Sequence, residues 1–301
     1  MSQDNLLGRT IAGYRLLQHI GEGGTSLVFR AEHPERGSAA VKILRGRQAQ
    51  DPLAVKRFLR EGEFGVKANH PNIIRTYDYG EADGLYYIAL EWADGEPLGD
   101  FLLGAGHLAP ALVARIVSQL GQALTATHEA GIIHRDLKPA NIMYDPATQT
   151  ARLLDFGIAR NTDDAPEQRL TRAGFFVGTL QYVAPEALSG ELVGEQADVY
   201  SLATIAYHLL VGRLPFAGKT PRELFQQLLT EKPIPLNQAA PDRRFSAELE
   251  AAVMKGLERD LGKRWKTVQE FADALARAAG AEAEEPRRGG SLLSRIFGKK
   301  E

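Results

Sequence analysis

Two short segments constrain the fold and chemistry of this chain more than any other feature. Residues 134–141 read His-Arg-Asp-Leu-Lys-Pro-Ala-Asn, and residues 155–157 read Asp-Phe-Gly after a short strand pattern. The first segment places a carboxylate (Asp136), an ammonium (Lys138) and an amide (Asn141) on one loop, and the second adds another carboxylate one hairpin away. These groups can hold magnesium ions and a triphosphate beside a hydroxyl nucleophile. The pattern therefore indicates a phosphate and metal site built from two loops.

The composition is that of a globular protein and argues against several other classes. The chain has 301 residues, of which 44% are apolar and 25% charged, the balance of an ordinary globular protein with room for two lobes. Its net charge of −2 argues against a nucleic-acid binder, whose domains are usually strongly basic. The absence of cysteine excludes disulfides and thiolate zinc sites. We find no signal-peptide pattern and no run approaching the ~18 apolar residues of a membrane-spanning helix, and we expect a cytoplasmic protein.

The order of the expected elements predicts an α+β protein with two lobes. Up to Glu91 the chain alternates in short strand-like runs separated by turns, with one helical stretch at about 53–68. After Gly95 the periodicity changes to that of helices. We therefore expect a small five-stranded β lobe with one main helix, followed by a larger, mainly helical lobe. The five expected strands are Leu16–Ile20, Leu27–Ala31, Ala39–Leu44, Ile73–Tyr79 and Tyr86–Glu91.

Several segments of the expected helical lobe carry clear helix signals. Residues 197–211 are apolar nearly all round, which predicts a buried helix. Thr220, Ser246 and Thr267 each stand where a side chain can cap the start of a helix. The helix that follows Thr267 is expected to run to about Gly280.

A glycine-rich turn lies between the first two expected strands. Residues 21–28 read Gly-Glu-Gly-Gly-Thr-Ser-Leu-Val, and glycines let backbone N–H groups come close to phosphate oxygens. Such a turn alone is more often a plain hairpin, and a Rossmann-type site does not fit because a strand follows. Lys42 ends the run Ala39-Ala40-Val41-Lys42 after this turn. A lone strand lysine usually faces solvent, but the preceding glycine turn favours a phosphate contact.

Taken together, these segments resemble the protein kinase family, and in particular the bacterial members of the eukaryotic-like serine/threonine kinases. The two loops resemble the catalytic and metal-binding loops of that family, and Lys138 is typical of serine/threonine rather than tyrosine kinases. Residues 178–186, Gly-Thr-Leu-Gln-Tyr-Val-Ala-Pro-Glu, resemble the end of an activation segment. The resemblance covers nearly the whole chain and implies a kinase domain at 14–280, with lobes at 14–91 and 92–280. We expect the residues before it to form a leader (1–13) and those after it to form a flexible basic tail (281–301).

The resemblance also implies a role for each site residue. Asp136 accepts or orients the proton of the substrate hydroxyl, and Lys138 faces the γ-phosphate. Glu61, in the helix of the small lobe, orients Lys42 toward the α- and β-phosphates. ATP is the implied nucleotide, with Mg²⁺ as its metal and Mn²⁺ as a substitute. The implied metal ligands are Asn141 and Asp155, and the implied nucleotide contacts are Ile20, Gly21, Glu22, Gly23, Gly24, Thr25, Ser26, Val28, Ala40, Lys42, Glu91 and Ala93, the last two in the hinge.

Three residues outside the active centre match the same family pattern. Asp198 is implied to bond the backbone of the catalytic loop, and Arg264 is the implied buried partner of Glu186. For Asp198 and Arg264 an ordinary surface charge remains the alternative. His134 is interpreted as a packed core histidine rather than a base or a metal ligand.

The chain departs from the family pattern in its glycine turn, and its expected small-lobe helix has a feature that is unusual for a functional helix. Ser26 stands where the third glycine of the turn is usual. Gly62 and Gly65 follow Glu61 in the expected helix, and each costs about 1 kcal/mol relative to alanine in a helix interior. The stability of this helix must therefore come from docking rather than from propensity.

The regulatory expectations concern three residues. Arg135 can pair with a phosphorylated residue of the activation loop, because phosphate adds charge and strong acceptors. We favour Thr171, flanked by Arg169 and Arg172, as the autophosphorylation site, with an ordinary polar loop as the alternative. Thr179 is expected to help select serine or threonine acceptors, and its alternative role is that of a phosphosite.

The expected activity is transfer of the ATP γ-phosphate to serine or threonine hydroxyls of proteins, including the chain itself. The expected partners are protein substrates and a transient homodimer for autophosphorylation in trans, without nucleic acid. Two alternatives stay open. A small-molecule phosphotransferase of kinase-like fold fits less well with the activation segment and Asp198. A pseudokinase scaffold fits less well with the intact set of Lys42, Asp136, Asn141 and Asp155.

The C-terminal tail supports two interpretations. Residues 287–300 hold five basic residues and no acidic ones, and four apolar residues fit one helical face. The simpler interpretation is a solvated tail, and the other is a weak contact with a partner or with the inner face of an anionic membrane. Liposome co-sedimentation of the full chain against a 1–280 truncation would separate them, and equal pelleting would contradict the membrane contact.

Overall fold

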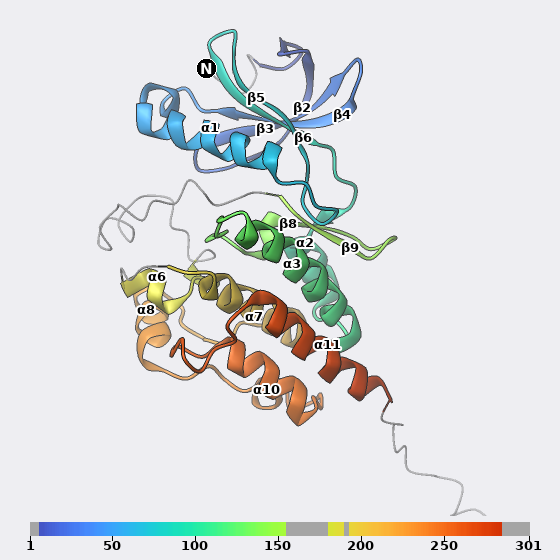
Figure 1. Ribbon diagram of the computed structural model, residues 1–301, viewed down its shortest axis with the longest axis vertical. Helices are drawn as coiled ribbons and strands as arrows, with labels where there is room; N and C mark the ends of the chain where they lie inside the picture. Colours follow the sequence, from blue (N-terminus) through green and yellow to red (C-terminus); the bar gives the residue numbers. More distant parts are fainter. Residues whose placement is uncertain (1–5, 155–179, 190–192, 285–301) are drawn as a thin grey trace, which may run out of the picture.

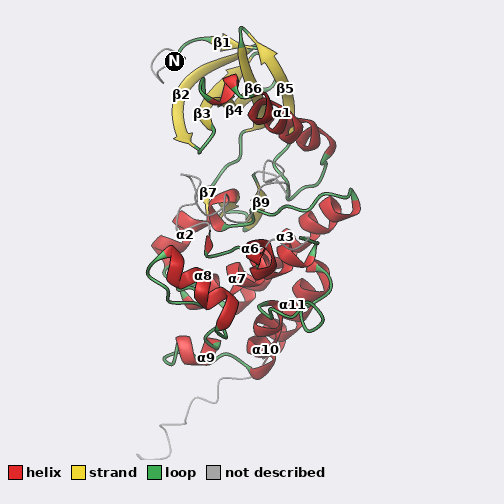
Figure 2. Cartoon of the chain, turned by 90° about the vertical axis from the view of Figure 1, so that its left-hand side faces the viewer, coloured by secondary structure: helices red, strands yellow, loops and turns green. Residues whose placement is uncertain are grey.

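The computed structural model describes residues 6–154, 180–189 and 193–284, which form two lobes (Figure 1). The upper lobe in that view is a curved antiparallel sheet with one long helix, and the lower lobe is built mainly from helices. Figure 2 shows the same division, with most of the strands in one lobe and nearly all helices in the other. The predicted α+β fold is confirmed.

The sheet of the small lobe has its strands in the order β1-β2-β3-β4-β6-β5, with antiparallel pairing throughout. Because side chains alternate between faces along a strand, its apolar residues form two clusters on opposite faces. Val41 belongs to one cluster, and Leu44, with Phe58 of the helix, belongs to the other. This alternation places Lys42 on the face that carries the helix. The strands are β1 (Thr10–Ile11), β2 (Tyr14–Glu22), β3 (Ser26–His33), β4 (Gly37–Leu44), β5 (Thr76–Ala82) and β6 (Leu85–Glu91).

Two details of the sheet differ from the expectation. The two-residue strand β1 pairs with the start of β2 and adds a sixth strand, and its Ile11 is buried, as is Leu6 before it. The strand expected from Ile73 begins only at Thr76, because Ile73 instead forms a parallel bridge with Leu153 of the large lobe. Tertiary pairing thus decided the start of this strand, which propensity alone could not do.

Helix α1 (Pro52–Lys67) is the main helix of the small lobe. Its start is capped by Asp51, whose side chain accepts a hydrogen bond from Leu53 N at 2.9 Å, and proline occupies the first turn. The helix buries Phe58, Gly62 and Gly65 and lies across β5. Both glycines thus lie on the face of α1 that docks on the sheet.

Helix α7 (Gln196–Val211) lies at the centre of the large lobe and packs against helices on several sides. It is buried nearly all round, as predicted for residues 197–211, and it ends at Gly212, whose φ of 76° is left-handed. The caps at Thr220, Ser246 and Thr267 are present. The other helices are α2 (Leu98–Ala105), α3 (Pro110–Glu129), α6 (Pro185–Ser189), α8 (Pro221–Thr230), α9 (Leu236–Ala239), α10 (Ala247–Gly256) and α11 (Val268–Glu284), with 3₁₀ turns η2 (Gln48–Gln50) and η3 (Pro139–Asn141).

A second, three-stranded sheet belongs to the large lobe, and two of its strands follow residues 134–141. It consists of β7 (Glu96–Pro97), β8 (Ile142–Asp145) and β9 (Thr150–Leu153). The chain between α1 and β5 is tied to β9, because Ile74 N donates to Leu153 O at 2.8 Å and Leu153 N donates to Asn72 O at 2.9 Å. The strand that leads into residue 155 is thereby fixed to both lobes.

Among the described residues, no helix is both long and apolar enough to cross a membrane. The last described helix, α11, extends to Glu284, four residues past the expected end. Residues 285–301, which include most of the predicted tail, lie outside the described part of the chain.

Candidate active site

The small lobe contributes a buried ion pair. Lys42 lies in β4 between Val28 of β3 and Ile88 of β6, and its side chain points to the face covered by α1. There its Nζ lies 2.9 Å from Glu61 Oε1, and the residue is only 8% exposed. Lys42 and Glu61, predicted from distant parts of the sequence, are thus brought together. A nearly buried ammonium that a carboxylate holds in place is well positioned to meet a phosphate.

The glycine-rich turn closes the hairpin between β2 and β3. Gly23 N donates to Ser26 O at 2.8 Å, and Arg45 N donates to Thr25 O at 2.9 Å. A Cβ added at Gly21 or Gly24 would meet no atom within 4 Å, so the turn has open space beside it. Glycine at these positions therefore leaves the backbone N–H groups accessible, and close packing within the turn does not require it.

The backbone conformation at Ser26 explains why this position does not need the usual third glycine. It is the first residue of β3, pairs with Leu44 and is 9% exposed. A residue in regular strand conformation needs no glycine. An exposed ion pair also links the turn to the end of β4, since Arg45 Nη2 lies 2.7 Å from Glu22 Oε2. Ile20 is exposed at the end of β2, whereas Val28 and Ala40 are half-buried in β3 and β4.

The large lobe contributes a compact polar loop. Lys138 Nζ lies 3.2 Å from Asp136 Oδ2, and Asn141 Nδ2 donates to Asp136 O at 2.9 Å and to Asp136 Oδ2 at 3.2 Å. The turn η3 brings the three side chains together. Because Nδ2 of Asn141 makes both bonds, its Oδ1 is the atom left to face a cation. Carboxylate, ammonium and amide therefore form one cluster, as predicted.

Helix α7 anchors this loop from below. Asp198 is fully buried, and its carboxylate accepts hydrogen bonds from His134 N at 2.8 Å and Arg135 N at 3.0 Å. Arg135 has a φ of 60°, a left-handed conformation that costs a non-glycine residue energy and needs support from its surroundings. The predicted bond of Asp198 to the catalytic loop is confirmed, and His134 is fully buried, as expected. The sequence did not reveal His128, whose Nε2 lies 2.8 Å from Asp198 Oδ2.

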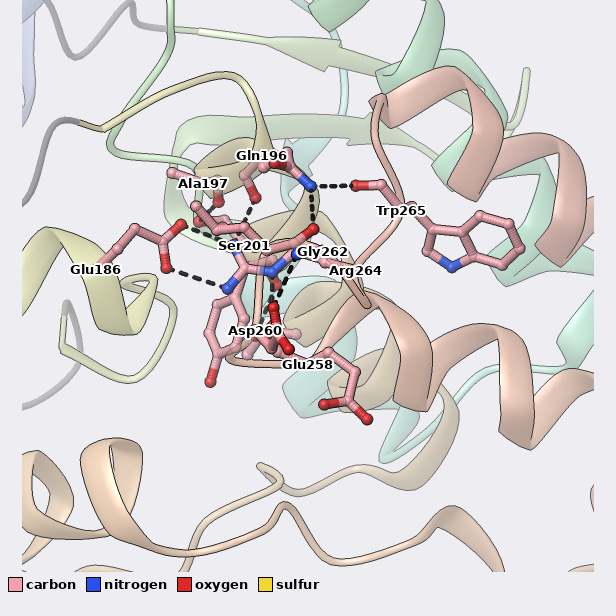
Figure 3. Close-up of polar contacts among 12 residues, drawn as sticks. Glu186, Gln196, Ala197, Ser201, Glu258, Asp260, Gly262, Arg264 and Trp265 are labelled. Carbon is pink, nitrogen blue, oxygen red and sulfur yellow. Dashed lines mark hydrogen bonds and ion pairs between the residues drawn. The ribbon is translucent and has the colours of Figure 1, made fainter.

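A buried ion pair ties Glu186 of α6 to Arg264, which lies between α10 and α11 (Figure 3). Arg264 Nη1 and Nη2 donate to the two oxygens of Glu186 at 2.7 and 3.0 Å. Other donor bonds of Arg264 reach the backbone oxygens of Glu258 at 2.7 Å and Gln196 at 2.8 Å. The predicted pairing of Arg264 with Glu186 is confirmed, and the surface-charge alternatives for Arg264 and Asp198 are wrong.

The hinge shows a contact that sequence reasoning missed. The carboxylate of Glu91, at the end of β6, accepts hydrogen bonds from Arg152 of β9 at 2.9 and 2.6 Å. Arg152 gives no signal in the sequence, because its strand simply alternates polar and apolar residues. The side chain of Glu91 is thus engaged by the large lobe, and its backbone N–H donates to Arg75 O at 2.8 Å. Ala93 packs against the cluster that contains Leu90 and Ile88.

This hinge contact should make stability depend on pH. The hydrogen bonds from Arg152 hold the pKa of Glu91 below its ordinary value. A lowered pKa contributes stability that is present above about pH 4.3, the ordinary value for Glu, and is lost as the pH falls through the lowered value. We expect Arg152→Met to cost about 1 kcal/mol at pH 7 and much less at pH 3. Urea unfolding of both proteins at the two pH values measures this, and an equal cost at both would contradict it.

Three of the predicted site residues lie outside the described part of the chain. They are the metal ligand Asp155 and the regulatory residues Thr171 and Thr179. The residue before Asp155 is described, and Leu154 N donates to Asn141 O at 3.0 Å. Leu154 also packs against the cluster of the small lobe that Ala40 and Ala93 adjoin. The described chain therefore leads toward the point where the catalytic loop and the small lobe approach each other.

Comparison of the sequence with known proteins shows the family to which this chain belongs. Residues 14–275 match the model of the protein kinase domain. The chain is 39% identical over 277 residues to the serine/threonine-protein kinase pkn3 of Myxococcus xanthus, covering 89% of this chain and 50% of that protein. It is 38% identical over 277 residues to the serine/threonine-protein kinase PknB of Mycobacterium tuberculosis, covering 90% and 44%. The chain thus spans about half the length of these relatives.

Solved structures agree with the sequence comparison. The crystal structure of the Mycobacterium tuberculosis PknI kinase domain is similar with a TM-score of 0.69 and 30% identity, covering 90% of this chain and 98% of that one. A structure of Rad53 1–466 in complex with AMP-PNP is similar with a TM-score of 0.72 and 28% identity, covering 88% and 65%. The chain belongs to the protein kinase family and is related to the bacterial serine/threonine kinases.

Proposed function

We propose that this chain is an ATP-dependent protein kinase that transfers the γ-phosphate to serine or threonine hydroxyls of proteins. The observation that carries the proposal is the cluster of Asp136, Lys138 and Asn141, held on a loop that Asp198 anchors. The Lys42–Glu61 pair on the other lobe supports it. Family membership agrees, since the similar proteins are named serine/threonine kinases.

Each residue has a role in the proposed transfer that suits its chemistry. Asp136 takes or orients the proton of the acceptor hydroxyl, and it can be held ready for this because its carboxylate contacts Lys138 and Asn141. Lys138, 3.2 Å from Asp136, neutralises negative charge that develops on the transferred group. Lys42 fixes the α- and β-phosphates while Glu61 holds its ammonium in place.

The donor set fits a hard divalent cation beside the phosphates. Asn141 Oδ1 and the carboxylate of Asp155 are oxygen ligands of the kind that Mg²⁺ prefers, and Mn²⁺ accepts similar ligands. When bound, the metal neutralises charge on the phosphate oxygens and orients the γ-phosphate. The glycine turn at 21–26 and the backbone of the hinge at 91–93 would hold the nucleotide, together with Ile20, Val28 and Ala40.

A phosphotransfer assay separates this function from its two alternatives. The chain is incubated with Mg²⁺ and γ-labelled ATP, with a generic protein acceptor in one set and small hydroxyl compounds in another. Label on serine or threonine of the acceptor is expected, whereas label only on small molecules would indicate a small-molecule phosphotransferase. Binding of ATP without any transfer, equal to an Asp136→Asn control, would indicate a pseudokinase.

The proposed enzyme is also its own substrate, at Thr171. Arg135 stands next to Asp136 and can pair with a phosphate on the activation loop, which would order that loop. After incubation with Mg-ATP we expect mass spectrometry to find phosphate on Thr171, and Thr171→Val to lower the specific activity by about tenfold. A phosphorylation rate that rises with the square of protein concentration would support transfer within a transient homodimer. An unmodified Thr171 in active protein would contradict the assignment.

A further inference from the structure

Helix α1 meets β5 more closely than ordinary side chains allow. A Cβ added at Gly62 would lie 2.4 Å from Tyr79 Cβ and 2.6 Å from its Cγ. A Cβ added at Gly65 would lie 2.1 Å from Thr76 Oγ1 and 3.0 Å from Thr76 Cβ. Real Cβ atoms essentially never approach other heavy atoms within 3.0 Å. At these two positions the helix backbone itself is therefore in contact with the strand.

The two glycines lie on one face of α1, because residues three apart in a helix are neighbours on its surface. Gly62 directly follows Glu61, which extends toward Lys42, and Gly65 lies about one helical turn after Glu61. Glycine is the poorest ordinary helix former, so two of them in the second half of α1 oppose local propensity. Gly104 in α2 offers a contrast, since a Cβ there would meet no atom within 4 Å.

The ion pair depends on the spacing between these elements. Lys42 is fixed in β4, which pairs with β6, and β6 pairs with β5. Tyr79 pairs with Ile88, and Ile88 pairs with Lys42, so Tyr79 and Lys42 are two strands apart in one register. The surface on which α1 rests and the lysine that Glu61 must reach therefore belong to one rigid sheet. Any added thickness between α1 and β5 carries Glu61 away from Lys42.

We propose that Gly62 and Gly65 are positioning residues, which set the separation of α1 from Thr76 and Tyr79 so that Glu61 reaches Lys42. The inference rests on the proposed kinase function, because the Lys42–Glu61 pair matters for phosphate binding. The two positions differ in how they can adapt. The obstacle at Gly62 is the Cβ of Tyr79, which no rotamer change can move, whereas the nearest obstacle at Gly65 is a hydroxyl that can be deleted.

Steady-state kinetics of full-length alanine variants test the proposal. In Gly62→Ala, relief of the clash with Tyr79 requires α1 to shift by about 1 Å. A misplacement of that size should lower kcat/KM for ATP by about 10²-fold. Gly65→Ala should lower kcat/KM for ATP as well. Adding Thr76→Ala to Gly65→Ala should raise kcat/KM about tenfold above that of Gly65→Ala alone. The matched control is Gly104→Ala, which places the same substitution in open space and should change the rate less than about twofold.

A double-mutant cycle shows whether the glycines act through the ion pair. In a Glu61→Gln background, Gly62→Ala should lower kcat/KM for ATP by less than about threefold, because the ion pair with Lys42 is already lost in that background. An equal loss in both backgrounds would contradict a positioning role and indicate general destabilisation. If Gly62→Ala does not fold, as judged by circular dichroism, the same cycle is run with Gly65→Ala, in the natural and the Glu61→Gln backgrounds, with the same two outcomes.

The outcomes also separate this inference from the proposed function. If the unmodified chain transfers phosphate in an Asp136-dependent manner and both glycine variants match its kcat/KM, the positioning role is overturned alone. If the unmodified chain transfers no phosphate, the proposed function itself fails.

Discussion

Replacing Asp136 by asparagine should lower kcat for phosphate transfer to a protein acceptor by about 10³-fold. The amide cannot accept the hydroxyl proton, and it removes the negative charge that Lys138 faces at 3.2 Å. The loop itself should survive, because Asn141 Nδ2 also bonds the backbone oxygen of residue 136, which the substitution leaves in place. The measurement is the initial rate with saturating Mg-ATP, together with ATP affinity by calorimetry.

The affinity measurement gives this prediction its specificity. We expect the Asp136→Asn variant to bind ATP within about threefold of the unmodified chain, because the proposed contacts to the adenine and to the α- and β-phosphates lie elsewhere. Asp242→Asn is the matched control, since Asp242 is exposed and lies 3.9 Å from the cation of Arg243. An Asp136→Asn variant with unchanged kcat would contradict the role given to this carboxylate.

The largest expected effect on stability comes from Arg264. In Arg264→Met the carboxylate of Glu186 loses both hydrogen bonds from the guanidinium and remains buried, which should lower the free energy of unfolding by about 3–5 kcal/mol. The backbone oxygens of Glu258 and Gln196 lose their bonds to Arg264 as well. Urea unfolding followed by circular dichroism measures the change.

Two companion variants show whether the loss comes from the buried carboxylate. Adding Glu186→Leu to Arg264→Met removes that carboxylate and should recover part of the stability. Lys263→Met, one residue away, removes an exposed cation 3.8 Å from Asp260 and should cost less than about 1 kcal/mol. A loss for Arg264→Met as small as that for Lys263→Met would contradict the importance of the buried pair.

The parts of the site that could be predicted are those whose chemistry is local in the sequence. Asp136, Lys138 and Asn141 lie within six residues of each other on one loop, so their grouping followed from the motif. The resemblance to kinases then implied the longer-range pairs of Lys42 with Glu61 and of Arg264 with Glu186, which the structure contains.

Contacts set by tertiary packing could not be predicted. Arg152 meets Glu91 only because β9 lies against the chain that connects α1 to β5, and nothing in its own strand marks it. His128 looks like an ordinary polar residue at the end of α3, yet it lies against the buried carboxylate of Asp198. The glycines of α1 were visible as a cost in propensity, but their steric reason depends on where β5 runs.

The most direct test of the whole account is a crystal structure of this chain with magnesium and a non-hydrolysable ATP analogue. We expect the α- and β-phosphates beside Lys42 Nζ, a metal ion bound by Asn141 Oδ1 and the carboxylate of Asp155, and the γ-phosphate facing Asp136 and Lys138. An analogue bound elsewhere, or phosphates that contact neither Lys42 nor Asn141, would contradict the account.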